Sequence, residues 1–324
     1  MTRDLTPLFL SDAEIAGLRI DPREMVRAVE AAFRSLSEGR AVAGGKLPVR
    51  LSDGCYFTAK AGALPDEGYA AVKWYGVVAD NDGRGLPGFV PIVILNSVET
   101  GLPLAVMDGQ WLTAARTAAI AAAAARILAK PDSAAVGFVA CGRQADANLD
   151  ALLPHFPLRR VVAYSRTRAS AERLAARAES LGLSAEVARR PQDAVAGMDI
   201  VVTSVPRLPG PTRFLDAGWL SAGAFVAMVD MGFSWNELTV PREAAVFTDA
   251  FEPGTRTSRE MLNLPGPFAA DLAEMIADPA GWRADGSSRR AFVFAGAGIA
   301  DVAAAAVVYR HALARRGLAT PEAG

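Results

Sequence analysis

The stretch Ala134–Thr167, which reads AAVGFVACGRQADANLDALLPHFPLRRVVAYSRT, decides the fold. Its apolar run Val136–Ala140 has the length and composition of a buried parallel strand. A tight turn follows, and small and apolar residues then recur at helical spacing before a second apolar run, Val161–Tyr164. A strand, a turn, a helix and a second strand within about 30 residues predict the first half of a dinucleotide-binding unit.

The turn after the first strand must let backbone N–H groups approach a pyrophosphate, and the dipole of the following helix favours an anion there. Gly142 allows this close approach, and Ala145 is small enough for the helix to pack on the strand. Alanine stands at the position of the first glycine of the usual pattern. The residues of the turn that we expect to bind the cofactor are Ala140, Gly142, Arg143 and Gln144.

The end of the second strand indicates which dinucleotide is bound. Cofactors without a 2′-phosphate usually meet an acidic residue there, which accepts a hydrogen bond from the ribose. This chain has Ser165, Arg166 and Thr167 instead, and hydroxyls with a guanidinium suit a phosphate. We therefore expect NADP (NADPH) to be preferred, with NAD as the alternative cofactor. The competing interpretation is a surface turn with an incidental arginine.

Length and composition exclude several classes of protein. A chain of 324 residues is long for one core and indicates two domains. The formal net charge of −1 argues against nucleic acid or an anionic membrane as a partner. Cys55 and Cys141 lie far apart, and no signal peptide is evident, so we expect a cytoplasmic protein.

The N-terminal half predicts helices followed by a mainly antiparallel sheet. Ser11 and Glu14 have the spacing of a capping box, and Asp21-Pro22 begins a helix that runs to about Glu38. Turn residues such as Asp53-Gly54 separate five short apolar runs, as in a β-meander. These runs are Leu47–Leu51, Tyr56–Ala61, Ala70–Val78, Phe89–Asn96 and Leu104–Met107.

Two cations occupy unusual positions. The neighbours of Lys73 are nearly all apolar, and a buried ammonium needs an anion; the alternative is the exposed face of an edge strand. With Thr113 as the N-cap of an Ala-rich helix, Arg116 and Thr117 fall in its first turn. An arginine is unfavourable in that turn unless a carboxylate or phosphate binds there.

The C-terminal half continues the alternation of strands and helices. The apolar run Met198–Val205 contains Ser204, which we count among the cofactor-binding residues, and the run Gly223–Val229 ends at Asp230. Residues just past the carboxyl ends of parallel strands face the crevice that binds ligands. Asp230 is therefore the candidate acid or base, and a cap of the following loop is its alternative role.

Three motifs, in this order, resemble the ornithine cyclodeaminase/mu-crystallin family. They are Leu112-Thr113-x-x-Arg116-Thr117-Ala118-Ala119, the turn that ends in Gln144-Ala145, and Phe294-x-x-x-Gly298-x-x-Asp301 before an Ala-rich helix. The resemblance implies an α/β fold, with a Rossmann-type dinucleotide-binding domain plus an α/β substrate and dimerisation domain. We expect residues 118–298 to form the first domain and residues 1–117 with 299–324 the second, in a homodimer.

The resemblance also implies roles for individual residues. Arg50, Lys73 and Arg116 fall on the family's cations for the substrate carboxylate, and Thr117 falls on a cofactor-phosphate contact. The family's catalytic aspartate falls near Asp230, which is displaced by one residue, with Lys73 as the alternative acid/base group. The family's proline and lysine after this aspartate are missing. Threonine, lysine and serine are usual where this chain has Gly88, Ala295 and Gly296.

Three functions follow from these expectations. The first is an NAD(P)H-dependent reductase of an imine or cyclic ketimine carboxylate, an amino/imino acid substrate whose nitrogen proton Asp230 handles. The second is ornithine cyclodeaminase, which uses NAD to convert ornithine to proline and ammonia; Ser165 and Arg166 argue against it. The third is a nucleotide- or ligand-binding protein without turnover, as mu-crystallins can be.

The histidines argue against a hydroxy-acid dehydrogenase, which would need one as its acid/base group. We expect His155, in a turn after the nucleotide helix, and His311, inside the last helix, to be structural. Two histidines and two scattered cysteines also show no recognisable metal-site spacing.

Overall fold

The computed structural model describes residues 6–206, 213–249, 264 and 268–318. The chain divides into two compact units, Met1–Arg116 with Ala297–Gly324, and Thr117–Gly296. The boundaries expected from the sequence lie within two residues of these. Both units are mixtures of helices and strands, so the protein has an α/β fold.

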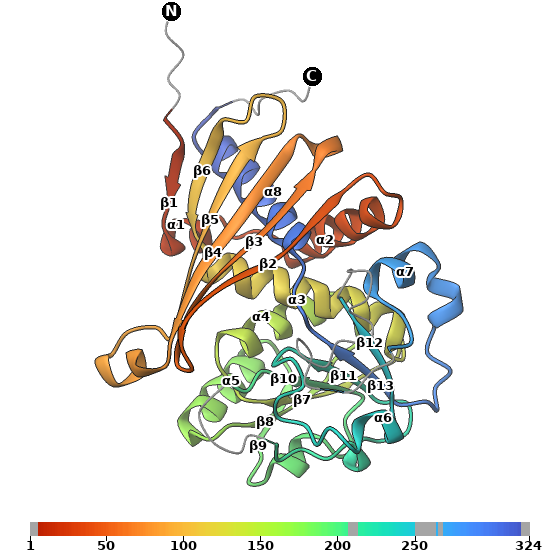
Figure 1. Cartoon of the computed structure of the whole chain (residues 1–324). Helices are drawn as coiled ribbons and strands as arrows, with labels where there is room; N and C mark the ends of the chain where they lie inside the picture. Colours follow the sequence, from red (N-terminus) through yellow and green to blue (C-terminus); the bar gives the residue numbers. More distant parts are fainter. Residues whose placement is uncertain (1–5, 207–212, 250–263, 265–267, 319–324) are drawn as a thin grey trace, which may run out of the picture. The chain divides into compact units, whose positions relative to one another are not determined.

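The first unit is built on a six-stranded sheet (Figure 1). The order β1-β6-β5-β4-β3-β2 places β2 to β6 as antiparallel neighbours, which confirms the predicted meander. The additional strand β1 pairs in parallel with β6. The strands are β1 (Leu8–Leu10), β2 (Val42–Ser52), β3 (Cys55–Leu64), β4 (Tyr69–Val78), β5 (Phe89–Ser97) and β6 (Pro103–Asp108).

Helices α1 (Asp12–Gly17), α2 (Pro22–Ser37) and α8 (Gly298–Arg315) complete this unit. The Ser11 capping box and the Asp21 N-cap begin α1 and α2 as predicted. The apolar stripe of α2 is buried, and α8 packs on β3 and β4 beside α2. Its first turn approaches β3 so closely that a Cβ on Gly62 would lie 2.9 Å from the Ile299 nitrogen. This close approach determines where Asp301, in the same turn, meets the sheet.

The second unit holds a seven-stranded parallel sheet in the order β12-β13-β11-β10-β7-β8-β9. The chain passes from β7 outward to β9 and then returns to the other side of β7. That reversal is the topological switch point of a Rossmann-type fold, where ligands bind beyond the carboxyl ends of the strands. The strands are β7 (Ala135–Val139), β8 (Arg160–Tyr164), β9 (Ser184–Val187), β10 (Ile200–Thr203), β11 (Phe225–Met228), β12 (Ala245–Thr248) and β13 (Arg290–Val293).

Helices α4 (Arg143–Leu152) and α5 (Arg168–Ser180) follow β7 and β8, as the sequence predicted. Shorter helices are α6 (Val240–Glu243) and α7 (Leu272–Ala277). Short 3₁₀ helices are η1 (Pro65–Glu67), η2 (Ala79–Arg84), η3 (Pro191–Ala194), η4 (Ala217–Trp219) and η6 (Pro279–Trp282).

Helix α3 (Gly109–Leu128) begins earlier than the sequence predicted. Asp108 accepts a hydrogen bond from the Gln110 N–H at 2.8 Å, and Asp12 accepts one from the Trp111 N–H at 2.7 Å. These carboxylates satisfy N–H groups of the first turn, so the helix starts before Thr113. Thr113 is therefore not the N-cap, and Arg116 does not lie in the first turn.

The Ala-rich part of α3 is buried, as expected of a packed helix. Within the ranges that the structure describes, no helix combines the length and the apolarity needed to cross a membrane.

Candidate active site

Lys73, Arg116 and Asp301 form a buried ionic cluster in the first unit. Lys73 Nζ donates to Asp301 Oδ1 at 2.7 Å, and Arg116 Nε lies 2.8 Å from the same oxygen. Lys73 and Asp301 side chains are each only 1% exposed. Strand β4 has neighbours on both sides, so the edge-strand interpretation of Lys73 is wrong. The prediction that the Lys73 ammonium needs an anion is confirmed, and the anion is the carboxylate of Asp301.

Charge in the cluster shifts two pKa values. Burial acts to raise the pKa of Asp301, but the charges of Arg116, Lys73 and Lys60 outweigh it and lower that pKa. Burial lowers the pKa of Lys73 to about 8, with a further contribution from Arg116 that Asp301 opposes. Two buried polar atoms of the cluster make no hydrogen bond within the described structure, Asp301 Oδ2 and Arg116 Nε. Arg116 Nε lies close to Asp301 Oδ1, but its N–H does not point at that oxygen.

Lys60 belongs to the same cluster and was not predicted from the sequence. It lies on β3 directly opposite Lys73 and is 6% exposed. Burial lowers its pKa well below the ordinary value, and the nearby cations Lys46, Lys73 and Arg116 lower it further. Its apolar neighbours Ala59 and Ala61 carry the same signal as those of Lys73, but its position opposite Lys73 follows only from strand register.

Arg50 is not brought into contact with Asp301. It is exposed on β2 opposite Tyr56, four residues along β3 from Lys60. That interval corresponds to about 13 Å along a strand. Its role as a third carboxylate-binding cation therefore stays a prediction.

In the second unit, the nucleotide turn has the features that a pyrophosphate requires. Ala140 adopts a φ of +70°, the left-handed conformation that favours glycine and explains the usual residue there. Gly142 is the N-cap of α4, and a Cβ built on it would meet nothing within 4 Å. No neighbouring group crowds Gly142 at this helix N-terminus, so these residues fit a dinucleotide phosphate. Gln144 is half-buried in the first turn, and Arg143 is exposed beside it.

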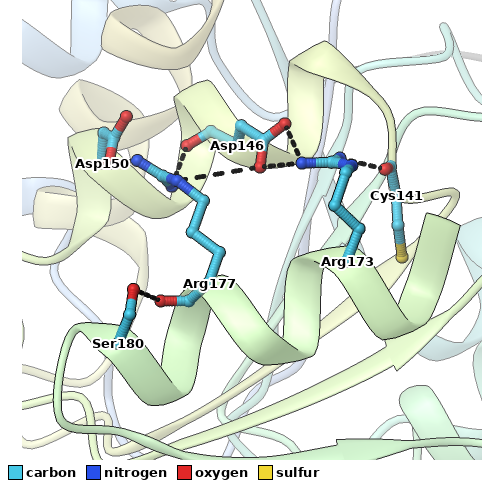
Figure 2. A network of polar contacts seen from close by, with 6 residues as sticks. All are labelled: Cys141, Asp146, Asp150, Arg173, Arg177 and Ser180. Atoms are coloured by element: carbon cyan, nitrogen blue, oxygen red, sulfur yellow. Dashed lines mark hydrogen bonds and ion pairs between the residues drawn. The ribbon is translucent and has the colours of Figure 1, made fainter.

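Two arginines of α5 contact the turn and the helix α4 that follows it (Figure 2). Arg173 Nη2 donates to the Cys141 carbonyl at 2.7 Å, and its Nη1 donates to Asp146 Oδ1 at 3.0 Å. Arg177 donates to Asp150 Oδ1 at 2.7 Å. These bonds connect the turn and α4 to the neighbouring helix. Burial raises the pKa of the Cys141 thiol to about 12, so it stays protonated at neutral pH.

The remaining candidate cofactor residues lie at strand ends or in α3. Ser165 is half-buried after β8, and Arg166 and Thr167 are exposed. Ser204, just after β10, donates to the Ala140 carbonyl at 3.2 Å and so connects β10 to the nucleotide turn. Thr117 is buried in α3.

Asp230 follows β11 and is held by four hydrogen bonds. Oδ1 accepts from the Thr203 hydroxyl at 3.1 Å and the Gly232 N–H at 3.3 Å. Oδ2 accepts from the Ser234 hydroxyl at 2.6 Å and the Val205 N–H at 3.3 Å. Burial raises the pKa of Asp230, and these hydrogen bonds oppose that rise only in part. The Asp230 carboxylate therefore caps the loop that follows β11, which is the alternative role considered from the sequence. A catalytic role would be added to this structural one.

The two histidines have other neighbours. His311 Nε2 is 2.9 Å from Glu24 Oε2, between α8 and α2, and His155 follows α4. Among the described residues, no three His, Cys, Asp or Glu side chains are grouped closely enough to hold a metal ion.

Comparison with known proteins covers nearly the whole chain. The chain is 32% identical over 319 residues to an alanine dehydrogenase of Archaeoglobus fulgidus, covering 95% of this chain and 96% of the relative. It is 28% identical over 316 residues to the ketimine reductase mu-crystallin of Mus musculus, covering 94% and 96%.

A solved structure is also similar to this chain over nearly its whole length. The Δ1-pyrroline-2-carboxylate reductase of Thermococcus litoralis, in complex with NADH and L-proline, superposes with a TM-score of 0.86 at 25% identity, covering 97% of this chain and 100% of that one. The sequence model of the ornithine cyclodeaminase/mu-crystallin family matches residues 6–316. The protein therefore belongs to the ornithine cyclodeaminase/mu-crystallin family.

Proposed function

We propose that the protein is an NADPH-dependent reductase of imine or cyclic ketimine carboxylates, which acts at the α-carbon. The observation that carries this proposal is the Lys73–Arg116–Asp301 cluster, which concentrates cations on one carboxylate oxygen. The single carboxylate of Asp301 cannot balance the charges of both Lys73 and Arg116, so the cluster favours a further anion. The carboxylate of an amino or imino acid is such an anion.

Each residue has a distinct part in this proposal. Arg116 and Lys73, assisted by Arg50, hold the substrate carboxylate and so orient the α-carbon. The bound cofactor supplies a hydride to that carbon. As the C=N double bond becomes a single bond, the nitrogen takes up a proton, and we assign its delivery to Asp230, with Lys73 as the alternative donor. The residues that would hold the cofactor are Thr117, Ala140, Gly142, Arg143, Gln144, Ser165, Arg166, Thr167 and Ser204.

A substrate screen tests the reaction. Oxidation of NADPH and NADH is followed with cyclic imine carboxylates and with 2-oxo acids plus amines, and ammonia release is assayed with ornithine. Reduction of imine carboxylates without ammonia release from ornithine supports the proposal. Ammonia release with bound NAD would identify a cyclodeaminase, and cofactor binding without any turnover would identify a binding protein.

Arg166 determines the cofactor preference in this proposal. Arg166→Ala should weaken NADPH binding by about 1–3 kcal/mol, because a charge-assisted contact to the 2′-phosphate is lost. NADH binding should change little. Titration of each cofactor by fluorescence measures both constants, and equal losses would exclude recognition of a 2′-phosphate by this arginine.

Lys73 should determine the alkaline limb of the pH profile. Because its pKa is lowered to about 8, the ammonium that holds the carboxylate is lost as the pH rises through that value. We expect kcat/KM to fall above about pH 8 with unit slope. Lys73→Arg keeps its charge across this range, so its profile should lack the inflection. An unchanged inflection in Lys73→Arg would assign the titration to another group.

The open face of the first unit's sheet supports the expected homodimer. Trp74 and Ile92 pair across β4 and β5 and are 38% and 39% exposed, and Phe57 stacks on Trp74. An exposed apolar face of this kind favours association. Trp74→Glu should convert a dimer to monomers, as measured by sedimentation equilibrium; a wild-type monomer would contradict the proposal.

For location, we propose the reducing cytoplasm. Cys55 and Cys141 are both free thiols, and thiols persist in that compartment.

A further inference from the structure

Three successive carbonyl groups of the nucleotide turn accept hydrogen bonds within the protein. The Ala140 carbonyl accepts from the Ser204 hydroxyl, and the Gly142 carbonyl accepts from N–H groups in the first turn of α4. The Cys141 carbonyl between them accepts from Arg173 Nη2 at 2.7 Å (Figure 2). Arg173 lies 32 positions further along the chain, on α5. The orientation of the Cys141–Gly142 peptide is therefore tied to the neighbouring helix.

This contact fixes the direction of the Gly142 N–H. In a planar trans peptide, the C=O of one residue and the N–H of the next point in opposite directions. Because the Cys141 carbonyl points at Arg173, the Gly142 N–H points away from it. Gly142 is the N-cap of α4, so its N–H stands beside the N–H groups of the helix N-terminus. Arg173 thus adds a directed backbone donor to the group that suits a phosphate.

Gly142 allows the same peptide to reverse. The φ and ψ of Gly142 are −89° and −163°. A planar peptide reverses by rotation about the two bonds beside it, which would move φ of Gly142 by about 180°, to about +90°, and leave its ψ unchanged. That combination of angles is essentially restricted to glycine. In the reversed peptide, the Cys141 carbonyl oxygen would take the place of the Gly142 N–H, and an oxygen repels a phosphate.

A second arginine on α5 provides a natural comparison. Arg173 also pairs with Asp146, in the first turn of α4, at 2.9 Å. Arg177, one turn later on α5, pairs with Asp150 at 2.7 Å and donates to the Asp146 carbonyl at 3.4 Å. Both arginines therefore connect α5 to α4, and they differ in the hydrogen bond from Arg173 to the turn (Figure 2).

We propose that Arg173 is a positioning residue of the cofactor site, which holds the Cys141–Gly142 peptide so that the Gly142 N–H faces the pyrophosphate of the dinucleotide. The inference rests on the proposed function, because it takes the nucleotide turn as the cofactor site, but it does not depend on the substrate. Without Arg173, the reversed peptide becomes populated. The apparent affinity for the dinucleotide then falls with the fraction of protein that keeps the binding orientation.

Calorimetric titration of the whole protein with NADPH and with NADH, without substrate, tests this role. Arg173→Met should weaken the binding of both by about tenfold, because a charge-assisted hydrogen bond no longer holds the peptide. The two losses should be equal, since both dinucleotides carry the pyrophosphate. The Arg173 side chain is 49% exposed, so its replacement leaves no buried cavity. Unchanged affinities in Arg173→Met would overturn the proposal.

Arg177→Met is the matched control. It removes an arginine that pairs across the same two helices but makes no hydrogen bond to the turn among the described residues. We expect it to change the affinity for either dinucleotide by less than about twofold. Equal losses in Arg173→Met and Arg177→Met would assign both arginines to the packing of α5 on α4 and overturn the proposal.

The double variant Arg173→Met/Asp146→Asn separates orientation from charge. In Arg173→Met, the Asp146 carboxylate loses its closest cation and could itself repel a phosphate. Orientation of the peptide by Arg173 predicts that the loss of about tenfold persists when this carboxylate is also removed. Recovery of the wild-type affinity in the double variant would assign the effect to the charge of Asp146 and overturn the proposal.

Gly142→Ala tests the reversal itself. A Cβ at this position meets nothing within 4 Å, and alanine tolerates the observed angles but not those of the reversed peptide. Measured against Gly142→Ala alone, the further change Arg173→Met should weaken NADPH binding by less than about threefold. Any crowding of the phosphate by the new methyl group cancels in this comparison. A loss of about tenfold in this background too would show that Arg173 does not act through the peptide.

Binding and turnover together separate this inference from the proposed reaction. Loss of dinucleotide affinity confined to Arg173→Met, in a protein that reduces no imine carboxylate, would support the inference and reject the reaction. Reduction of imine carboxylates by the wild-type protein, with unchanged dinucleotide affinity in Arg173→Met, would reject the inference and leave the reaction standing. Failure of the wild-type protein to bind either dinucleotide would overturn both.

Discussion

Asp301→Asn should destabilise the protein by about 3–5 kcal/mol near neutral pH, because it leaves buried cations without their carboxylate. Urea denaturation measures this difference. Carboxylates such as acetate should stabilise the variant more than the wild type, since an added anion can take the place of the lost one. The exposed pair of Glu186 and Arg160 provides the control, and Glu186→Gln should have little effect.

The pH dependence of this destabilisation follows from two pKa values. The pKa of Asp301 is lowered below its ordinary 3.8, so its contribution is fully present above about pH 4 and is lost as the pH falls through the folded value. The pKa of Lys73 is lowered to about 8, so the cost of burying its charge is relieved as the pH rises from there toward 10.5. The difference in free energy of unfolding between Asp301→Asn and the wild type should therefore become smaller at both low and high pH. A constant difference would show that Asp301 acts through packing alone.

Asp230→Asn should lower turnover by at least about 100-fold, because it removes the proposed proton donor. The hydrogen bonds predict a second effect. Each carboxylate oxygen faces one backbone N–H, from Gly232 or from Val205, so the amide NH₂ meets a donor in either orientation. The variant should therefore also lose about 1–3 kcal/mol of stability. Single-turnover kinetics with saturating NADPH, at a temperature where the variant is folded, measure the chemical step.

Ser234→Ala is the matched control for this substitution. It removes the 2.6 Å hydrogen bond to Oδ2 but keeps the carboxylate. We expect a modest loss of stability and a loss of turnover below about tenfold. Similar turnover losses in the two variants would assign Asp230 to holding the loop alone. Near-normal turnover in Asp230→Asn would place the acid/base group elsewhere, with Lys73 as the next candidate.

Local pattern was sufficient for the elements and for the nucleotide-binding half. The strand, turn and helix after Ala134 depend on apolar runs, small residues and caps that lie within one short stretch. The meander and the helix N-caps were predictable for the same reason. At α3, the local pattern predicts Thr113 as the cap, but Asp108 and the distant Asp12 accept the hydrogen bonds of the first turn.

The sequence by itself determined that Lys73 needs an anion, since burial of an ammonium among apolar residues carries a cost that any fold must offset. Only the tertiary structure decided which anion it is. Asp301 lies 228 positions away along the chain, and α8 reaches β3 and β4 because Gly62 allows a close approach. Strand register then places Lys60 opposite Lys73 and leaves Arg50 further along the sheet. Charges that are distant in sequence interact through space, so their balance appears only once the strands and the helix are packed.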